Sequence, residues 1–266
     1  MNKKLVLITG ASAGLGLACA NRLHDSGWTV IGASRRGTSS GAWRGLSMNV
    51  DDDDSVNNGV AEIIAQHGRI DAVITGAGWG LAGPAEQTPI TDARAQMETN
   101  FWGTVRVVNA TLPIMRHQGG GRLVAVSSLC GVIAIPFQSF YSASKFALEG
   151  YVEALAYEVE PFNVHVTLVE PGNFKTDFTA NRRTVASPAD DPYAAATSKA
   201  ISTMERDESN GADPALVAKS VERVLGLIRP PRHISVGKSG ERVGLIAKRL
   251  LPYRVFERAA RSSLGI

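Results

Sequence analysis

The sequence predicts an α/β fold in which helices cover both faces of a parallel sheet, a doubly wound arrangement. Short runs of consecutive apolar residues are typical of strands that are buried on both faces. Segments with helical spacing alternate with these runs, as in sheets built from strand–helix–strand units. Within the 266 residues no linker rich in Pro, Gly or Ser separates two cores. We therefore expect one domain over residues 1–266.

The elements follow one another from the N-terminus in a regular alternation. Residues 4–9 form an apolar run before a glycine-rich turn, and residues 15–23 continue with helical spacing. Further strands are expected at residues 29–33, 71–75, 122–127 and 164–169, and further helices at 55–66, 92–116 and 141–160. With right-handed crossovers, a ligand would bind beyond the carboxyl ends of these strands.

Composition excludes several classes of protein. With 44% hydrophobic and 20% charged residues, the chain is neither disordered nor collagen-like nor a multispanning membrane protein. Cys19 and Cys130 cannot form a disulfide framework, so a reducing, cytoplasmic location is expected. The five histidines are scattered without i,i+4 pairing or carboxylates nearby in the sequence, so no metal site is expected.

The first turn is a candidate phosphate-binding loop. Gly10 would permit a tight turn, Gly14 would let the backbone approach a pyrophosphate, and Gly16 would allow close helix packing. Ser12 and Leu15 lie between these glycines and belong to the same candidate site. The alternative is a tightly packed turn between strand and helix without a ligand.

The end of the second predicted strand bears on the choice of dinucleotide. A site specific for NAD would place an Asp or Glu here for the ribose hydroxyls, but the chain has Ser34, Arg35 and Arg36. Ser34 can bind a 2′-phosphate by a hydrogen bond, and the two arginines can neutralise it. The position therefore favours NADP(H), although two arginines on a surface loop are also common.

A tyrosine and a lysine form the candidate catalytic pair. Tyr141 and Lys145 are four residues apart, which places them on one face of a helix. We expect the ammonium group to lower the pKa of the phenol, which is about 10 when unperturbed. Ser128, at the end of the preceding strand, and Asn100, in the helix before it, add to the pattern. An exposed Tyr–Lys pair on a helix is the alternative.

Together these motifs resemble the short-chain dehydrogenase/reductase family, over about residues 3–240. The matching pieces are Thr9-Gly10-x3-Gly14-x-Gly16, Asn100, Ser128, Tyr141-x3-Lys145, and Pro171-Gly172 with Thr176. Residues 140–149 and 161–171 are most similar to the branch of 17-beta-hydroxysteroid and retinol dehydrogenases. The resemblance implies a Rossmann fold.

The resemblance also implies roles for single residues. Tyr141 would be the acid or base, Lys145 would tune it and bind the nicotinamide ribose, Ser128 would bind the substrate oxygen, and Asn100 would take part in a proton relay. The remaining cofactor-binding positions that it implies are Asn49, Val50, Gly76, Ala77, Gly78, Pro171, Gly172, Phe174 and Thr176, together with Tyr141 and Lys145. Two positions depart from the family pattern. Gly76 stands where the family has an Asn that braces the sheet, and Asn49 stands where it has an Asp.

The expected function is that of an NADPH-dependent oxidoreductase acting on a carbonyl or a secondary alcohol of a small, fairly apolar substrate. An NAD-linked alcohol dehydrogenase and a non-catalytic dinucleotide-sensing module are the alternatives. The candidate apolar wall comprises Trp79, Cys130, Val132, Ile135, Phe174 and Phe178. The resemblance also implies a homodimer or homotetramer formed through the helices at 92–116 and 141–160.

Two segments of different character follow the last predicted strand. Residues 173–212 are irregular and then helical, and we expect them to form a substrate lid after what would be the sixth strand of the family's sheet. Residues 238–266 form a basic helical tail, and the chain from Arg229 onward carries a net charge of +7. Nucleic acid is not expected as its partner; a solvated face or a subunit contact is favoured. A membrane contact through the apolar stripe 243–251, beside Arg242, Lys248 and Arg249, stays open.

Overall fold

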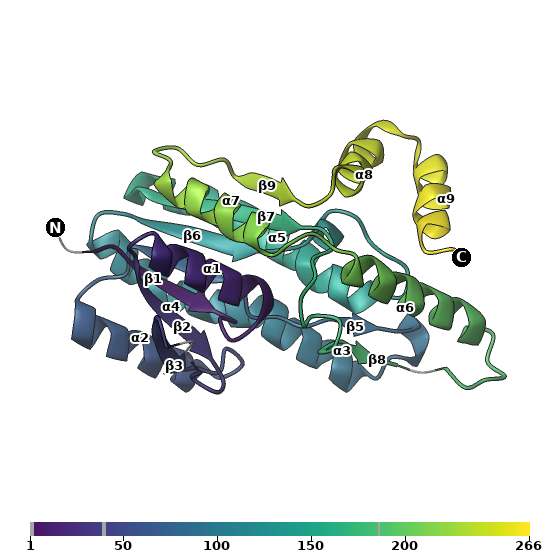
Figure 1. Ribbon diagram of the computed structural model, residues 1–266, viewed down its shortest axis with the longest axis horizontal. Coiled ribbons are helices and arrows are strands. Elements are labelled where there is room, and N and C mark those ends of the chain that lie inside the picture. The colour runs from purple at the N-terminus through teal and green to yellow at the C-terminus, as the bar shows by residue number, and fades with distance from the viewer. Residues whose placement is uncertain (1–2, 39–40, 186) are drawn as a thin grey trace.

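In the computed structural model, which describes residues 3–38, 41–185 and 187–266, seven parallel strands form one sheet in the order β3-β2-β1-β4-β6-β7-β9 (Figure 1). These strands are β1 (Leu5–Thr9), β2 (Thr29–Ser34), β3 (Arg44–Ser47), β4 (Ala72–Thr75), β6 (Gly121–Val126), β7 (Val164–Pro171) and β9 (His233–Val236). A small second sheet pairs β5 (Leu81–Ala82) with β8 (Arg183–Thr184). The predicted single-domain, doubly wound fold is confirmed.

The strand order reverses beside β1. The chain runs outward from β1 through β2 to β3, then returns to β4 on the other side of β1 and continues outward to β9. All residues of β1 and β4 are buried, which explains their unbroken apolar sequences. Such a reversal opens a crevice at the carboxyl ends of the two central strands.

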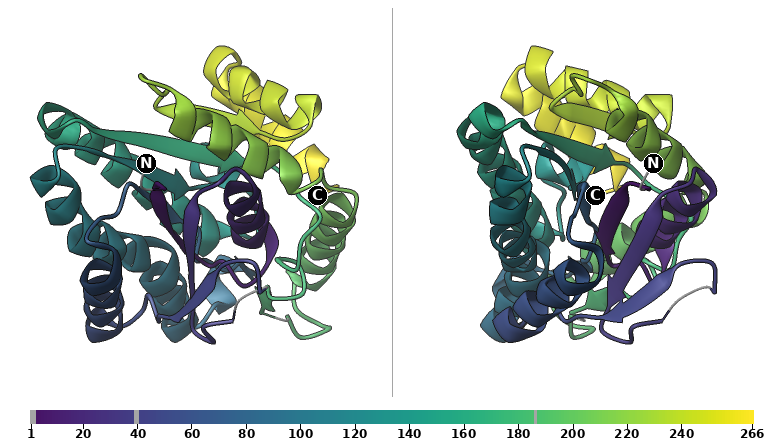
Figure 2. Two further views of the ribbon diagram at one scale, coloured as in Figure 1. Left: turned by 60° about the vertical axis from the view of Figure 1, so that its left-hand side comes forward. Right: turned by 90° about the vertical axis from the view of Figure 1, so that its left-hand side faces the viewer.

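Helices cover both faces of the sheet (Figure 2). The helices are α1 (Gly14–Asp25), α2 (Asp53–His67), α3 (Ile90–Met97), α4 (Gly103–His117), α5 (Ser139–Val159), α6 (Ala194–Ser209), α7 (Ala215–Gly226), α8 (Ser239–Leu250) and α9 (Tyr253–Ser263). α1 and α7 pack on one face, where they share a core with β1, β2 and β4. α2, α4 and α5 bury a second core against the opposite face.

Three features differ from the predicted elements. β3 was not predicted because only one of its four residues is buried, as suits a strand at the edge of the sheet. β9 is short and only partly buried, and its pairing with β7 depends on the tertiary fold. The helix predicted at 92–116 is divided into α3 and α4 by a π-helical turn, Glu98–Trp102. A turn of this kind often marks a functional site.

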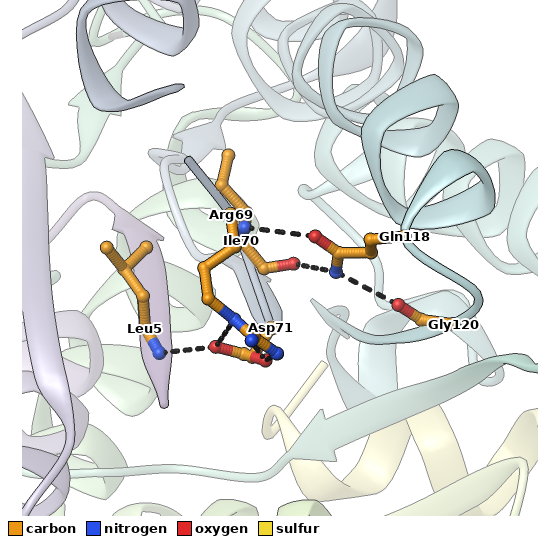
Figure 3. Close-up of polar contacts among 6 residues, drawn as sticks. All are labelled: Leu5, Arg69, Ile70, Asp71, Gln118 and Gly120. Carbon is orange, nitrogen blue, oxygen red and sulfur yellow. Dashed lines mark hydrogen bonds and ion pairs between the residues drawn. The ribbon is translucent and has the colours of Figure 1, made fainter. Parts of the chain in front are cut away.

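Polar contacts at the amino ends of the strands fix the central part of the sheet (Figure 3). The backbone N–H of Leu5 donates to the carboxylate of Asp71 at 2.7 Å, which links the starts of β1 and β4. The side-chain amide of Gln118 donates to the carbonyl oxygen of Ile70 at 2.6 Å and to that of Gly120 at 3.0 Å. These contacts brace the edge of the sheet that lies opposite the crevice.

The chain ends in two helices that lie outside the two main cores. α8 and α9 stand out from the body near α6 (Figure 1). Within the described residues, no helix combines the length and the apolar character that are needed to cross a membrane.

Candidate active site

A cavity of about 920 Å³ opens at the carboxyl ends of the strands. Its wall consists of the loops after β1, β2, β4, β6 and β7, and of residues from the predicted lid and tail. Every predicted cofactor-binding residue lines this cavity: Gly10, Ser12, Gly14, Leu15, Gly16, Ser34, Arg35, Arg36, Asn49, Val50, Gly76, Ala77, Gly78, Tyr141, Lys145, Pro171, Gly172, Phe174 and Thr176. Positions spread over about 165 residues of sequence thus share one wall.

Ser128, Tyr141 and Lys145 meet in the same cavity. Ser128 follows β6, and its Oγ accepts a hydrogen bond from the N–H of Cys130 at 3.1 Å. Tyr141 and Lys145 lie one turn apart at the start of α5, and only 7% and 6% of their surfaces are exposed. The Nζ of Lys145 donates to the carbonyl oxygen of Val126 at 2.9 Å and lies 6.0 Å from the ring centroid of Tyr141.

Burial decides the protonation of this group. It raises the pKa of Tyr141, an effect that the hydrogen bond with Ser128 opposes only in part. Burial also lowers the pKa of Lys145 to about 8. Desolvation of the phenolate is the largest effect on this phenol, so its pKa lies above the ordinary value and not below it. Tyr141 holds its proton near neutral pH, which is the form that a general acid needs.

Asn100 lies behind the cavity wall. Its side chain is buried in the π-helical turn, where Oδ1 accepts from the N–H of Trp79 at 3.0 Å. Its Nδ2 donates to the carbonyl oxygen of Trp79 at 3.0 Å and to Oγ of Ser144 at 3.1 Å. Ser144 in turn donates to the carbonyl oxygen of Tyr141 at 2.7 Å, and Oδ1 of Asn100 and Nζ of Lys145 lie 3.0 and 4.0 Å from the place that a Cβ on Gly78 would take. Asn100 thus lies beside the turn of α5 that carries Tyr141 and Lys145, although it is outside the cavity lining, and its contacts also position the loop after β4.

The glycine-rich loop fits a dinucleotide. Gly10 and Gly14 have φ values of +72° and +55°, and a Cβ on Gly16 would lie 2.3 Å from the carbonyl oxygen of Gly10. Larger residues would therefore distort the loop. No side chain caps the N-terminus of α1, so the first N–H groups of this 12-residue helix are available to an anion at the cavity.

The end of β2 presents two cations to the cavity. Arg35 and Arg36 are exposed, and neither forms an ion pair in the part of the chain that the structure describes. The Oγ of Ser34 is buried and has no hydrogen-bond partner among the described residues. The arginines are thus the more accessible of the three groups.

The two departures from the family pattern have local explanations. The N–H groups of Gly76 and Ala77 donate to Oγ1 of Thr9 at 3.2 and 3.3 Å. This hydroxyl ties the loop after β4 to β1 without a side chain at position 76. The Oδ1 of Asn49 accepts from the N–H of Asp51 at 3.3 Å, so the amide stabilises its own turn at the cavity.

Most of the predicted apolar wall lines the cavity near Tyr141. Trp79, Cys130, Ile135, Phe174 and Phe178 are all in its wall, and the rings of Phe178 and Tyr141 lie 5.7 Å apart. Burial raises the pKa of Cys130 to about 11, so this thiol stays protonated. Placing Val132 in the wall was wrong: it lies outside the cavity lining, where its carbonyl oxygen accepts from Lys248 of α8.

The last two helices contribute cavity residues that were not predicted from the sequence. Those of α9 and the residue after it follow one helical face: Phe256, Ala259, Ala260, Ser263 and Leu264. Leu264 packs with Ala200 and Met204 of α6. The spacing i, i+3, i+4, i+7, i+8 was a readable signal, but its direction toward the cavity depends on how α9 packs.

A buried ion pair joins the two ends of the segment 173–212. Arg182 pairs with Glu208 of α6, and the Arg182 side chain is 2% exposed. Glu208 also accepts from Oγ1 of Thr179 at 2.5 Å and lines the cavity. Two guanidinium nitrogens of Arg182, Nε and Nη1, have no partner among the described residues. The pair fixes α6 beside the loop that carries Phe178.

His233 is not isolated from carboxylates, contrary to expectation. Its Nδ1 lies 2.9 Å from Glu170 and 3.6 Å from Glu149, and its Nε2 lies 3.2 Å from Glu153. These residues come from β9, β7 and α5, so only the tertiary fold brings them together. Burial raises the pKa of Glu149 to about 7. The carboxylates lie on both sides of the imidazole ring.

Comparisons with known proteins agree with this geometry. The family model described as short chain dehydrogenase matches residues 4–186. The chain is 38% identical to a 3-ketodihydrosphingosine reductase of Bacteroides thetaiotaomicron, over 98% of each chain. It is 34% identical to retinol dehydrogenase 8 of Bos taurus, covering 86% of this chain and 80% of that protein.

A solved structure shows the same fold over the full length. A short-chain dehydrogenase from Streptomyces avermitilis superposes with a TM-score of 0.83 and 30% identity, and the match covers 98% of both chains. Sequence motifs, sheet topology and cavity wall thus agree. The chain belongs to the short-chain dehydrogenase family of nicotinamide-dependent oxidoreductases.

Proposed function

We propose that the protein is an NADPH-dependent reductase of a ketone in a fairly apolar substrate, able to run in reverse as an alcohol dehydrogenase. One observation carries the proposal: Ser128, Tyr141 and Lys145 are buried together in the cavity onto which the glycine-rich loop opens. A non-catalytic sensor of dinucleotides would not need a protonated phenol beside a serine at this place.

The side chains can perform the proton chemistry of this reaction. The bound dinucleotide would supply or accept the hydride, held by the glycine-rich loop, Lys145 and Thr176. The hydroxyls of Ser128 and Tyr141 donate hydrogen bonds to the substrate oxygen, and each such donor can stabilise the developing charge by about 3 to 4 kcal/mol. Tyr141 then gives its proton to that oxygen. In the reverse direction the phenolate takes the proton back, and the ammonium of Lys145 stabilises it.

Replacing Tyr141 by phenylalanine tests the assignment of the acid. The variant keeps the ring beside Phe178 but lacks the proton, so turnover should fall at least ~100-fold with cofactor affinity nearly unchanged. Tyr151→Phe is the matched control on the same helix, since its ring packs on Phe101 away from the cavity. Steady-state assays should show near-normal turnover for the control. Normal turnover in Tyr141→Phe would refute the role of Tyr141.

The NADPH preference is supported by the two unpaired cations at the end of β2. A hydrogen bond between charged groups contributes about 1.5 to 3 kcal/mol, so NADPH should bind about 10- to 150-fold more tightly than NADH. The double variant Ser34→Asp, Arg35→Leu adds repulsion and removes attraction, and should reverse this preference. Dissociation constants from fluorescence quenching test it, with Arg94→Leu on α3 as an exposed control. Preference of the wild type for NADH would refute the assignment and favour an NAD-linked enzyme.

An apolar substrate is supported by the cavity and by the relatives. Ile135, Phe178, Phe256 and Leu264 line the cavity, and the ring of Phe178 lies beside that of Tyr141. The relatives named above are a 3-ketodihydrosphingosine reductase and a retinol dehydrogenase. A panel of long-chain, steroid, retinoid and short polar ketones, assayed with NADPH, identifies the class. Turnover of only the short polar ketones would refute an apolar substrate.

We also propose a homodimer or homotetramer in the cytoplasm. The oligomer is supported by Trp102, beside α4, and Tyr157, on α5, which are large aromatic side chains with 48% and 67% of their surfaces exposed. The cytoplasmic location is supported by the two free thiols, Cys19 and Cys130. Light scattering on the purified protein measures the mass of the oligomer, and a monomer would refute this part of the proposal.

A further inference from the structure

The last two helices expose an unusual number of apolar side chains. Fourteen large hydrophobic residues are exposed in the described part of the chain, and six of them lie within thirteen residues. We call these six the tail patch: Val243, Ile246, Leu250, Leu251, Tyr253 and Val255. Leu250 and Tyr253 are 76% and 79% exposed. Single exposed apolar residues are ordinary, whereas a cluster of this size marks a binding surface.

Packing within the chain does not account for the tail patch. Neither α8 nor α9 contains a buried residue among those the structure describes. Their attachment is largely polar: Glu241 accepts from the N–H of Asn173 at 3.2 Å, and Lys248 donates to the carbonyl oxygen of Val132. Lys248 also lies 4.9 Å from the ring centroid of Phe146. The apolar side of α8 therefore faces away from the two cores.

Unpaired cations alternate with the tail patch along the chain. Residues 238–266 contain seven basic and two acidic residues, a net charge of +5. Five arginines form no ion pair with any described residue: Arg242, Arg249, Arg254, Arg258 and Arg261. Apolar side chains between unpaired arginines are typical of helices that lie in the interface of an anionic bilayer.

The same two helices form part of the cavity wall. Gly244 and Ala247 of α8, and Phe256 and Ala260 of α9, line the cavity, while the tail patch consists of other residues of these helices and their connection. A bilayer in contact with the tail patch would thus lie beside the part of the cavity wall that α8 and α9 form. Figure 2 shows α8 and α9 together at one end of the molecule, beyond the sheet.

We propose that α8 and α9 dock the protein on an anionic membrane surface, with the tail patch inserted among the lipids and the arginines at the headgroups. A second copy of the chain is the competing occupant. A symmetric dimer through this surface would bring two +5 tails together, and the charges argue against that arrangement. Docking would let an apolar substrate pass from the bilayer to the cavity, a consequence that rests on the proposed function.

Binding to vesicles tests the docking without any assay of activity. Full-length protein is mixed with vesicles of pure phosphatidylcholine and with vesicles containing 30% phosphatidylglycerol, and the bound fraction is measured by flotation. We expect binding to the anionic vesicles that weakens as salt increases from 0.05 to 0.5 M, because screening shortens the range of the charges. Absence of binding to anionic vesicles at low salt would overturn the proposal.

Two variants separate the contributions of the surface. The triple serine variant removes apolar contact and consists of Val243→Ser, Ile246→Ser and Leu250→Ser. The triple arginine variant removes charge and consists of Arg242→Gln, Arg249→Gln and Arg254→Gln. None of the six wild-type side chains lines the cavity. Each basic residue near an anionic surface contributes about fivefold in affinity, so the triple arginine variant should bind about 100-fold more weakly. The affinity of the serine variant for vesicles should fall at least tenfold, because three polar side chains gain no free energy on leaving water for the lipids. Vesicle binding equal to that of the wild type in both variants would overturn the proposal.

Matched controls exclude a general loss of apolar or positive surface. Ile228→Ser removes a side chain that is 85% exposed, beside the start of β9 and the amino end of β6. Lys219→Gln with Arg223→Gln removes two exposed cations from α7. Both controls should bind vesicles like the wild type, and an equal loss in them would overturn the assignment to α8 and α9.

The outcomes also distinguish this inference from the proposed function. If the serine variant reduces a detergent-dispersed substrate normally but loses activity on the same substrate in vesicles, both proposals are supported. If vesicle binding is normal but no ketone is reduced, the proposed function fails and the docking stands. If the serine variant changes from dimer to monomer in light scattering, the tail patch is a subunit interface, and docking on membranes is overturned.

Discussion

Replacing Lys145 by methionine should stabilise the folded protein near neutral pH, although it removes the ammonium group from the cavity. Lys145 is 6% exposed, and the hydrogen bond that the structure shows for its Nζ is the one to the carbonyl oxygen of Val126. Burial accordingly lowers the pKa of this lysine from 10.5 to about 8. The folded state therefore bears the cost of a poorly solvated charge whenever Lys145 is protonated.

The magnitude follows from this pKa. One pKa unit corresponds to about 1.4 kcal/mol, so the lowering represents about 3 kcal/mol of free energy of unfolding. Loss of the hydrogen bond to Val126 would cost the variant about 1 kcal/mol. Methionine fills a similar volume and carries no charge. At pH 7 we expect Lys145→Met to exceed the wild type by about 2 kcal/mol.

The effect should depend on pH in one direction. Between about pH 8 and 10.5 the unfolded wild type binds a proton at this lysine that the folded protein does not, so wild-type stability rises with pH. Below pH 8 the lysine is protonated in both states of the wild type, so the variant keeps its full excess of free energy of unfolding over the wild type. Above pH 10.5 both are neutral and the cost of the buried charge is gone, so the lost hydrogen bond leaves the variant about 1 kcal/mol less stable than the wild type.

Urea unfolding of both proteins at pH 7, 8, 9 and 10.5 measures this difference. Lys219→Met, which removes an exposed lysine on α7, is the matched control and should leave the stability unchanged within about 0.5 kcal/mol at every pH. Catalysis and cofactor affinity of Lys145→Met should both fall, since the ammonium and its hydrogen bonds are lost. A stability difference between Lys145→Met and the wild type that stays constant from pH 7 to 10.5 would contradict the argument.

Two further predictions concern the lid segment and the glycine-rich loop. Arg182→Ala leaves the buried carboxylate of Glu208 without its cation and should lower the free energy of unfolding by about 3 to 5 kcal/mol. The control Arg183→Ala changes a side chain that is 61% exposed and should lower it by less than about 1 kcal/mol. Urea unfolding compares the two, and equal losses would refute a buried pair. Gly16→Ala forces a Cβ to within 2.3 Å of the carbonyl oxygen of Gly10, so it should lower the free energy of unfolding by about 1 to 3 kcal/mol and weaken NADPH binding. The control Gly150→Ala has open space around the added Cβ and should have neither effect. Calorimetry on both glycine variants tests this, and unchanged NADPH binding by Gly16→Ala would show that the loop can shift without loss.

Spacing along the chain was sufficient to predict the positions of residues whose arrangement depends on one loop or one helix. The turn from Gly10 to Gly16 depends on steric constraints within one loop, and Tyr141 and Lys145 share a helix face because they are four residues apart. The residues of these two patterns do line the cavity. They did not show that burial raises the pKa of Tyr141, because desolvation depends on everything packed around the ring.

Groups that come from distant segments were decided by the tertiary structure alone. His233 lies among Glu149, Glu153 and Glu170 only because β9 pairs with β7 and packs beside α5. Val132 lies outside the cavity lining and its carbonyl oxygen accepts from Lys248 of α8, a contact that no local pattern encodes.

By itself the sequence determined the doubly wound class of fold, the central strands and the helices between them, and many of the residues that line the cavity at the ends of those strands. Apolar periodicity and glycine placement act over a few residues, and so they can be recognised without knowing the fold. Only the tertiary structure decided which residues of the segment 173–212 and of α9 line the cavity, that Asn100 lies behind its wall, and which face of α8 stays exposed. These features depend on packing between segments far apart in the chain, where the free energy comes from the surface that both partners bury together.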